Sequence, residues 1–235
     1  LLSKEGYNVA TTNEDGEEDE QSFYQRDFEK KFFSDNTNKI FCKTFIENAL
    51  RDPITNEIGK SILFCVSQNH ASKITQILNE FADQKFPGKY NSDFAVQVTS
   101  LVQDAQQFTI NFTNNNLNGS GNFNAMYKTS KTRVCVTVGM MTTGYDCPDL
   151  LNVGLMRPIF SPTDFIQIKG RGTRKHDFLK ELLDKELAKE VLKPEKLKFK
   201  LFDFFANCEY FEKEFNYDEV IKLPVNSSKG DGSGG

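Results

Sequence analysis

Short apolar segments alternate with amphipathic segments across residues 59–215, and this alternation constrains the fold more than any other feature. The apolar segments are rich in β-branched residues and bounded by Gly, Pro or polar residues, as is typical of strands buried on both faces. The predicted strands cover residues 61–67, 94–100, 132–138, 151–156 and 199–205, and the predicted helices cover residues 70–81, 102–113 and 162–174. This order predicts an α/β fold with a mostly parallel, doubly wound sheet and helices on both faces.

Three further segments complete the domain organisation. Residues 14–20 hold six acids in seven positions, so we expect residues 1–21 to form an acidic disordered loop. Residues 22–58 form a helical lead-in, because their apolar residues recur at helical spacing. Residues 216–235 end in a Gly-rich stretch and are expected to form a flexible tail.

Composition and charge exclude several classes of protein. The net charge of −4 provides no global basic field, so any DNA site must be a local groove. The five scattered cysteines include no C-x-x-C pair, which favours buried thiols in a reducing cytoplasm over disulfides or a metal site. No apolar run reaches the roughly 18 residues of a membrane span. We expect a cytoplasmic protein without a metal cluster of its own, and, because no initiator Met is present, a fragment of a longer chain.

The most informative local pattern is QIKGRGTR, from Gln167 to Arg174. On a helix, Arg171 and Arg174 would lie on one face, and Gln167 would lie on that face one turn earlier. An arginine pair can neutralise the charge that develops on a transferring phosphoryl group. A solvated basic helix end is the alternative for two arginines alone. The glutamine, the two glycines and the preceding strands favour the phosphate site.

The helix that carries these arginines has clear start signals. Ser161 can cap it, Pro162 suits the first helical position, and Asp164 stands where a capping box places its acid. Upstream lie a strand, a Thr-Thr-Gly loop and a second strand. The predicted order is therefore strand, loop, strand and capped helix.

These segments resemble the motifs of a known superfamily. The sequence VTVGMMTTGYDCPDL resembles motif V of superfamily 2 helicases and translocases, QIKGRGTR resembles motif VI, and KSILFCVSQNH resembles the motif IV strand and its exit. The Thr-Thr-Gly and GRGTR pieces are most similar to the motor (R) subunit of type I restriction enzymes, as is the strand in residues 199–207. The resemblance covers about residues 22–215 and implies the second, C-terminal RecA-like domain, a three-layer α/β fold. In one departure, Gly139 stands where many members have aspartate.

The resemblance implies half of an ATPase cleft. Arg171 and Arg174 would reach the γ-phosphate as arginine fingers, and Gln167 would couple cleft closure to the nucleotide. Gly144 and Asp146 are in register with nucleotide-binding positions, and Asp146 would contact the ribose or link motifs V and VI. ATP and Mg²⁺ would be held mainly by an absent first RecA-like domain, so these 235 residues alone are expected to be inactive.

The resemblance also implies a DNA track and further partners. Candidate contacts to DNA phosphates lie in the predicted loops after strands, where ligands bind in parallel sheets; they are Ser67, Gln68, Thr99, Thr142 and Thr143. A capping or turn role is the alternative for each hydroxyl. The same sheet edge would face the nucleotide and the DNA. The expected partners are duplex DNA, the first RecA-like domain, and methylase and specificity subunits.

Two other patterns say less about function. Gly59-Lys60-Ser61 is not a phosphate loop, because Ile54 stands where that pattern needs glycine and because a strand, not a helix, follows. His70 and His176 are expected to be surface or capping histidines.

Two alternative functions remain open from the sequence. One is another superfamily 2 DNA or RNA helicase. The other is a non-catalytic docking domain with vestigial motifs, for which a predicted amphipathic helix over residues 178–193 is the candidate surface. Its apolar stripe comprises Leu179, Leu182, Leu183, Leu187 and Val191. Burial of that stripe against the domain's own sheet or the neighbouring helices is the favoured outcome.

Overall fold

The computed structural model describes residues 34–99, 105–115, 126–139 and 146–213. The acidic segment 1–21, residues 22–33 of the lead-in and the tail 216–235 lie outside those ranges. The elements, in chain order, are α2 (Asp35–Asn48), β1 (Ser61–Cys65), α3 (Gln68–Lys85), β2 (Ala95–Gln97), α4 (Ala105–Thr113), β3 (Val134–Thr137), β4 (Asn152–Met156), α5 (Pro162–Gly172), the 3₁₀ turn η3 (Phe178–Glu181), α6 (Lys185–Glu190), β5 (Lys200–Asp203) and α7 (Asn207–Lys213).

The five strands form one sheet in the order β2-β3-β1-β4-β5. Every pairing is parallel, with Ser61 of the central strand opposite Val134 on one side and Asn152 on the other. Every residue of β1, β3 and β4 is buried. This burial accounts for their largely apolar sequences. The parallel pairing confirms the predicted α/β class with a parallel sheet.

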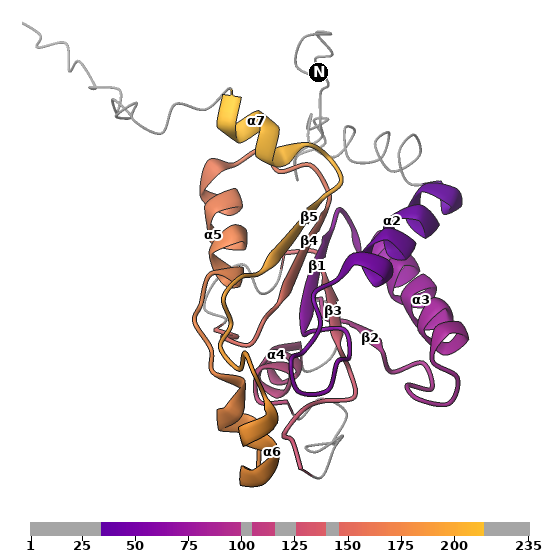
Figure 1. The fold of residues 1–235 in the computed structure, drawn as a ribbon. Helices are drawn as coiled ribbons and strands as arrows, with labels where there is room; N and C mark the ends of the chain where they lie inside the picture. Colours follow the sequence, from indigo (N-terminus) through magenta and orange to yellow (C-terminus); the bar gives the residue numbers. More distant parts are fainter. Residues whose placement is uncertain (1–33, 100–104, 116–125, 140–145, 214–235) are drawn as a thin grey trace, which may run out of the picture.

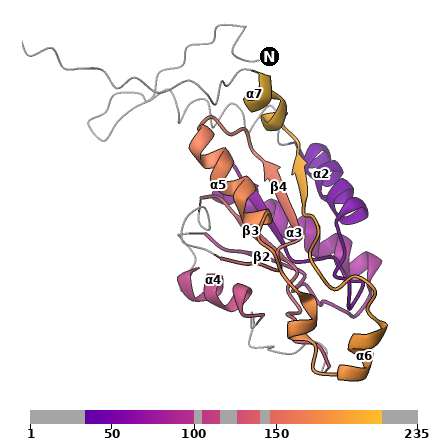
Figure 2. The same cartoon turned by 60° about the vertical axis from the view of Figure 1, so that its left-hand side comes forward.

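Helices cover both faces of the sheet, which gives the expected three layers (Figure 1, Figure 2). Successive side chains of a strand point to opposite faces. Leu63 and Cys65 of β1 therefore pack with α2 and α3, whereas Ile62 and Phe64 pack with α4, α5 and α7. Each fully buried Leu, Ile or Phe contributes about 1.5–3 kcal/mol relative to exposure. The two apolar layers fix the sheet between its helices.

Helix α2 lies within the predicted lead-in, residues 22–58, and forms part of the first layer. Its buried face consists of Asn38, Cys42, Phe45 and Ile46, which lie against α3. No helix in the described part of the chain is both long and apolar enough to cross a membrane. The five cysteines all lie within the described residues; four are buried, the fifth is half-buried, and none of them forms a disulfide.

The predicted helix over residues 178–193 is wrong. The chain there forms the short η3, an extended Leu182 and the six-residue α6. Backbone bridges pair Leu182 with Tyr127 and Asp177 with Glu195, and these pairings compete with a continuous helix. Asp184 then caps α6 by accepting hydrogen bonds from two backbone N–H groups.

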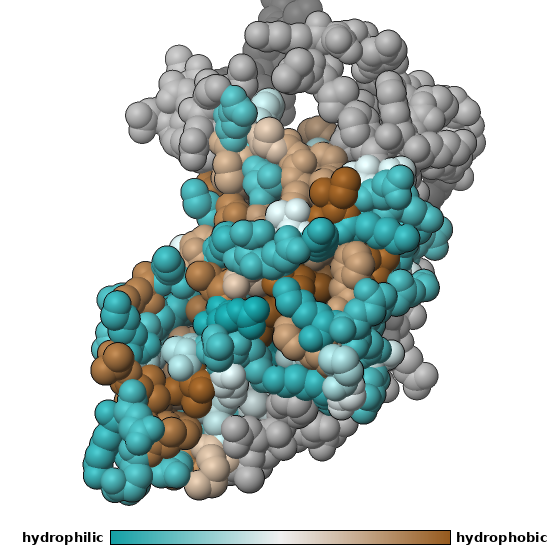
Figure 3. All heavy atoms as spheres, turned by 45° about the vertical axis from the view of Figure 1, so that its right-hand side comes forward, coloured by the Kyte–Doolittle hydropathy of each residue, from teal (hydrophilic) through white to brown (hydrophobic). Residues whose placement is uncertain are grey.

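The leucines of this segment consequently form no buried stripe. None of the α6 residues is buried, and Leu183 and Leu187 are 63% and 38% exposed. The space-filling view shows apolar residues interspersed with charged ones over this part of the surface (Figure 3). The favoured burial of the stripe against the sheet or neighbouring helices is therefore also wrong.

Candidate nucleotide and nucleic-acid sites

Helix α5 begins as the sequence predicts. The Ser161 side chain accepts a hydrogen bond from the backbone N–H of Asp164 at 3.3 Å, and Pro162 occupies the first helical position. The helix ends at Gly172 rather than at residue 174, with Thr173 as its cap. Arg174 therefore lies beyond the helix and does not continue the helical face predicted for it.

The three motif VI side chains differ in exposure and setting. Gln167 and Arg171 lie one turn apart on α5, where Gln167 is exposed and Arg171 is half-buried. The Arg174 Nε atom lies 3.4 Å from Asp146 Oδ1, and both side chains are more than 60% exposed. Such an exposed ion pair contributes only about 0–1 kcal/mol, so a competing anion can readily replace its carboxylate. The pair links the segment after β3 to the end of α5.

The second glycine of GRG has a packing role. A Cβ atom on Gly172 would overlap the ring of Phe199, which immediately precedes β5. Gly170, by contrast, has nothing within 4 Å of its Cβ position. Only the glycine at 172 is needed for the close approach of α5 to β5, so the two glycines are not equally close-packed.

Gly172→Ala is expected to destabilise the domain by about 1–3 kcal/mol, because the methyl group must displace the Phe199 ring. It should also lower ATP turnover of the full-length protein, because the end of α5 carries Arg171 and leads into Arg174. Thermal unfolding and ATP hydrolysis would measure both effects.

Gly170→Ala is the matched control for this substitution. It lies inside the same helix with open space at its Cβ, so it should raise stability by about 0.5–1 kcal/mol. Equal losses in the two variants would contradict the packing role of Gly172.

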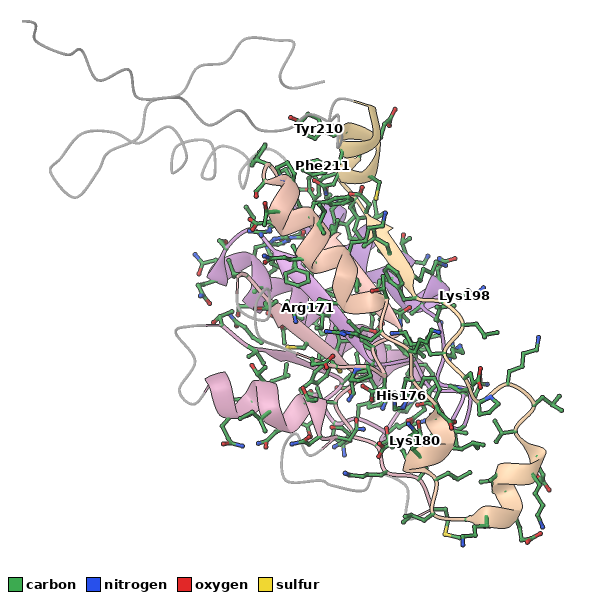
Figure 4. All side chains as sticks on the ribbon, turned by 90° about the vertical axis from the view of Figure 1, so that its left-hand side faces the viewer. Arg171, His176, Lys180, Lys198, Tyr210 and Phe211 are labelled. Carbon is green, nitrogen blue, oxygen red and sulfur yellow. The ribbon has the colours of Figure 1, made fainter. Side chains whose placement is uncertain are left out.

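The arginines lie toward the amino ends of the strands. Helix α5 follows the carboxyl end of β4, and its last residue packs on Phe199 at the start of β5. Figure 4 shows Arg171 on the lower part of α5, away from Tyr210 and Phe211 on α7, which follows the carboxyl end of β5. The nucleotide candidates are thus at one end of the sheet.

The nucleic-acid candidates that the structure describes lie at the other end. Ser67 caps α3 by accepting from the His70 N–H at 3.2 Å, and Gln68 accepts from the Gln97 side chain through its backbone and side-chain oxygens. Thr99 follows β2 and is 1% exposed, and its hydroxyl has no hydrogen-bond partner among the residues that the structure describes. The structure therefore brings the exits of β1 and β2 together, although Thr99 is covered.

Thr142, Thr143 and Gly144 lie outside the described residues, so their assignment stays a prediction. The described candidates for nucleotide contacts and those for DNA contacts do not share one edge of the sheet, contrary to the expected arrangement. Asp146 lies with Arg174, whereas Ser67 lies at the carboxyl ends of the strands.

Sequence reasoning missed a buried ionic network beneath Asp146. The ammonium of Lys60, 2% exposed, lies 2.7 Å from Asp149 Oδ2 and donates to the Phe112 and Thr113 carbonyl oxygens at 2.9 and 3.3 Å. Lys60 directly precedes β1, which confirms that Gly59-Lys60-Ser61 is no phosphate loop. The lysine is instead a structural cation.

Two further groups complete the network. Cys147 donates its thiol hydrogen to Asp149 Oδ1 at 3.1 Å, and Lys196 donates to the Pro148 carbonyl at 3.0 Å. Burial lowers the pKa of Lys196 to about 8, and burial also lowers the pKa of His176 despite the nearby carboxylate. These contacts fix residues 147–149, and so fix the base from which Asp146 reaches Arg174.

The sequence predicts a surface or capping role for His70, and the structure excludes the surface one. His70 is 4% exposed, its Nε2 lies 3.2 Å from the Asn38 side-chain oxygen, and its Nδ1 accepts from the Val66 N–H at 3.4 Å. Burial lowers the pKa of His70 to about 4. The neutral imidazole joins α2 to the β1–α3 connection. Among the described residues, no group of three or more His, Cys, Asp or Glu side chains is placed to hold a metal ion.

Comparisons with known proteins agree with the sequence motifs. The chain is 28% identical over 158 residues to the endonuclease subunit of the type I restriction enzyme EcoKI of Escherichia coli K12, a match covering 67% of this chain and 12% of that protein. It is 27% identical over 156 residues to the corresponding EcoAI subunit of Escherichia coli, covering 66% and 17%. The homologues of this chain are thus endonuclease subunits of type I restriction enzymes. The chain spans less than a fifth of their length.

The chain is also similar to a solved structure. A fragment assigned to an HsdR subunit of a type I restriction enzyme from Vibrio vulnificus YJ016 is 25% identical, with a TM-score of 0.48 over 81% of this chain and 31% of that one. No protein-family model matches the chain.

Proposed function

We propose that the chain is the second RecA-like domain of an ATP-dependent DNA translocase, the R subunit of a type I restriction endonuclease. The observation that carries the proposal is the exposed Asp146–Arg174 pair at the end of α5, which joins the segments resembling motifs V and VI. A first RecA-like domain in the parent chain would complete the ATPase cleft. The similarity to restriction endonuclease subunits supports this reading.

The residues present suit a phosphate-facing role. Arg174 is 63% exposed and, within the described part of the chain, is held by a weak surface ion pair, so it can exchange Asp146 for phosphate oxygens. Arg171 adds a second guanidinium on α5, and Gln167 lies one turn before it. Asp146, once released, can accept hydrogen bonds from a ribose, and Gly144 stays a predicted nucleotide contact. ATP with Mg²⁺, bound mainly by the first domain, supplies the phosphoryl group for transfer to water.

The DNA side of the proposal uses the opposite end of the sheet. Ser67 and Gln68 would contact the sugar-phosphate backbone without reading its sequence. Thr142 and Thr143 stay predicted contacts outside the described residues, and Thr99 is covered. Because the two sites lie at opposite ends of a packed three-layer domain, closure on the nucleotide would move the DNA contacts as one body. Recognition of a particular DNA sequence would belong to the methylase and specificity subunits.

The proposal is tested by ATP hydrolysis of the full-length protein without nucleic acid, with linear duplex DNA and with RNA. We expect linear duplex DNA to stimulate turnover and RNA to have no effect. Stimulation by RNA would instead indicate another superfamily 2 helicase. A rate that no nucleic acid changes would favour the docking-domain alternative, and substantial turnover by the 235 residues alone would contradict the half-cleft.

A further inference from the structure

Arg157 lies at the carboxyl edge of the sheet, directly after β4. Its neighbour Met156 pairs with Cys65 of β1, so Arg157 follows the two central strands on the side where Ser67 leaves β1. The position is rigidly held. The buried Asn207 side chain donates to the Arg157 carbonyl at 3.1 Å and accepts from the Ile159 N–H at 2.6 Å.

Asn207 is itself anchored at the β5–α7 junction. Its side-chain amide also donates to Asp203 Oδ1 at 2.8 Å, and Asp203 Oδ2 accepts from the Cys208 N–H at 2.6 Å. The backbone at Arg157 is therefore tied to two strands and to α7. A side chain on such a support is preorganised for binding.

The guanidinium of Arg157 has no hydrogen bond or ion pair with any residue that the structure describes, and its Nε is buried. Burial lowers the pKa of Arg157, while the carboxylate of Asp164 raises it without approaching within ion-pair distance. An arginine does not shed its proton in proteins, so partial burial leaves the Arg157 charge without an ion-pair partner among the described residues. Such a group favours an anion from outside the domain.

The position distinguishes between two phosphate sources. The nucleotide candidates Arg171 and Arg174 lie toward the amino ends of the strands, at the far end of α5. Ser67 and Gln68, the candidates for DNA contacts, leave the strand adjacent to β4. Arg157 thus adds a cation to the DNA side, where the other described candidates are uncharged.

We propose that Arg157 binds a phosphodiester of the DNA backbone and extends the line of contacts from the exits of β2 and β1 to the exit of β4. The assignment rests on the proposed function, since it presumes DNA along the carboxyl ends of the strands. It adds a contact that is electrostatic and independent of sequence.

The test is the salt dependence of duplex DNA binding by the full-length protein with a non-hydrolysable ATP analogue. Arg157→Gln should weaken binding and reduce the slope of log K against log salt by about 0.9, the value for one lost phosphate contact. Arg157→Lys should keep the slope. Arg51→Gln is the matched control, because Arg51 is exposed on the loop before β1 at the opposite end of the sheet.

Thermal unfolding separates this role from a structural one. The guanidinium has no partner to lose within the described residues, so Arg157→Met should leave the melting temperature unchanged or raise it while reducing the slope equally. This variant also serves if Arg157→Gln fails to fold. A lower melting temperature with an unchanged slope, or wild-type binding in both variants, would overturn the assignment. Failure of the wild type to bind DNA would instead overturn the proposed function, and the inference with it.

Discussion

Arg174→Ala in the full-length protein is expected to lower DNA-stimulated ATP turnover by about three to five decades, the usual effect of removing an arginine finger. The Arg174 side chain is 63% exposed and, among the described residues, forms an ion pair with Asp146. Its loss removes a planar hydrogen-bond donor from the transition state, and the methyl group of alanine cannot replace that donor. The rate should be followed under saturating ATP and linear duplex DNA.

Two further substitutions, one at Arg174 and one at the next residue, serve as controls for this result. Lys175→Ala removes an exposed cation immediately after Arg174 and should leave turnover near the wild-type rate. Arg174→Lys keeps the charge without the planar fork, so its turnover should stay well below wild type. DNA affinity should change little in all three, because the DNA candidates lie at the other end of the sheet.

The outcome also decides between functions. An unchanged rate in Arg174→Ala, in protein that still folds and hydrolyses ATP, would show that the arginine has no catalytic role. The docking-domain alternative would then account better for the chain. Loss of DNA binding together with turnover would place Arg174 on the DNA side, contrary to its position at the end of α5.

Sequence reasoning predicted the layers of the fold well, because buried parallel strands carry continuous apolar runs and the helices between them carry caps. Element ends were less accurate. The helix predicted over residues 70–81 continues to Lys85, since Ala82 still packs in the core. The failure over residues 178–193 has a tertiary cause. Its local helical periodicity is real, but pairing of Leu182 with Tyr127 prevails over it.

The site was predictable only where its parts are local. The cap of α5 follows from neighbouring residues, and the pairing of Asp146 with motif VI agrees with one of the two roles that the resemblance implied. The separation of the two ends of the sheet depends on the path from β3 to β4, which no local pattern encodes. The contact between Lys60 and Asp149 is equally non-local, and it emerges only from the folded chain.

Loss of the buried Lys60–Asp149 ion pair is expected to have the largest effect on the stability of the domain. Lys60→Met should destabilise the domain by about 3–5 kcal/mol, because it leaves the Asp149 carboxylate buried without its cation. The same change removes the donor to the carbonyls of Phe112 and Thr113 at the end of α4. Native-state hydrogen exchange at the β1 and β4 amides of the full-length protein would measure the loss locally.

A double variant provides the control for this effect. Lys60→Met with Asp149→Leu removes both charges, so it should recover a substantial part of the lost protection. Lys189→Met is a matched single control. That lysine is 71% exposed on α6 and pairs only with Glu186, so its loss should cost less than about 1 kcal/mol. An equal loss of hydrogen-exchange protection in Lys60→Met and in the double variant would show that the unpaired Asp149 carboxylate is not the main cause of the destabilisation.

The protection of the β1 and β4 amides against hydrogen exchange should depend on pH with opposite signs in the wild type and in Lys60→Met. Burial alone would raise the pKa of Asp149, but the Lys60 ammonium, together with the Cys147 thiol and His176, outweighs it and holds that pKa below its ordinary value of 3.8. The wild-type contribution is therefore complete above pH 3.8 and is lost as the pH falls through the lowered pKa. Without Lys60, burial should raise the pKa of Asp149 above 3.8, so the folded domain gains a proton before the unfolded chain does. Protection in the variant should then increase as the pH falls toward 3.8, and a decrease attributable to Asp149 over that range would refute the assigned pairing.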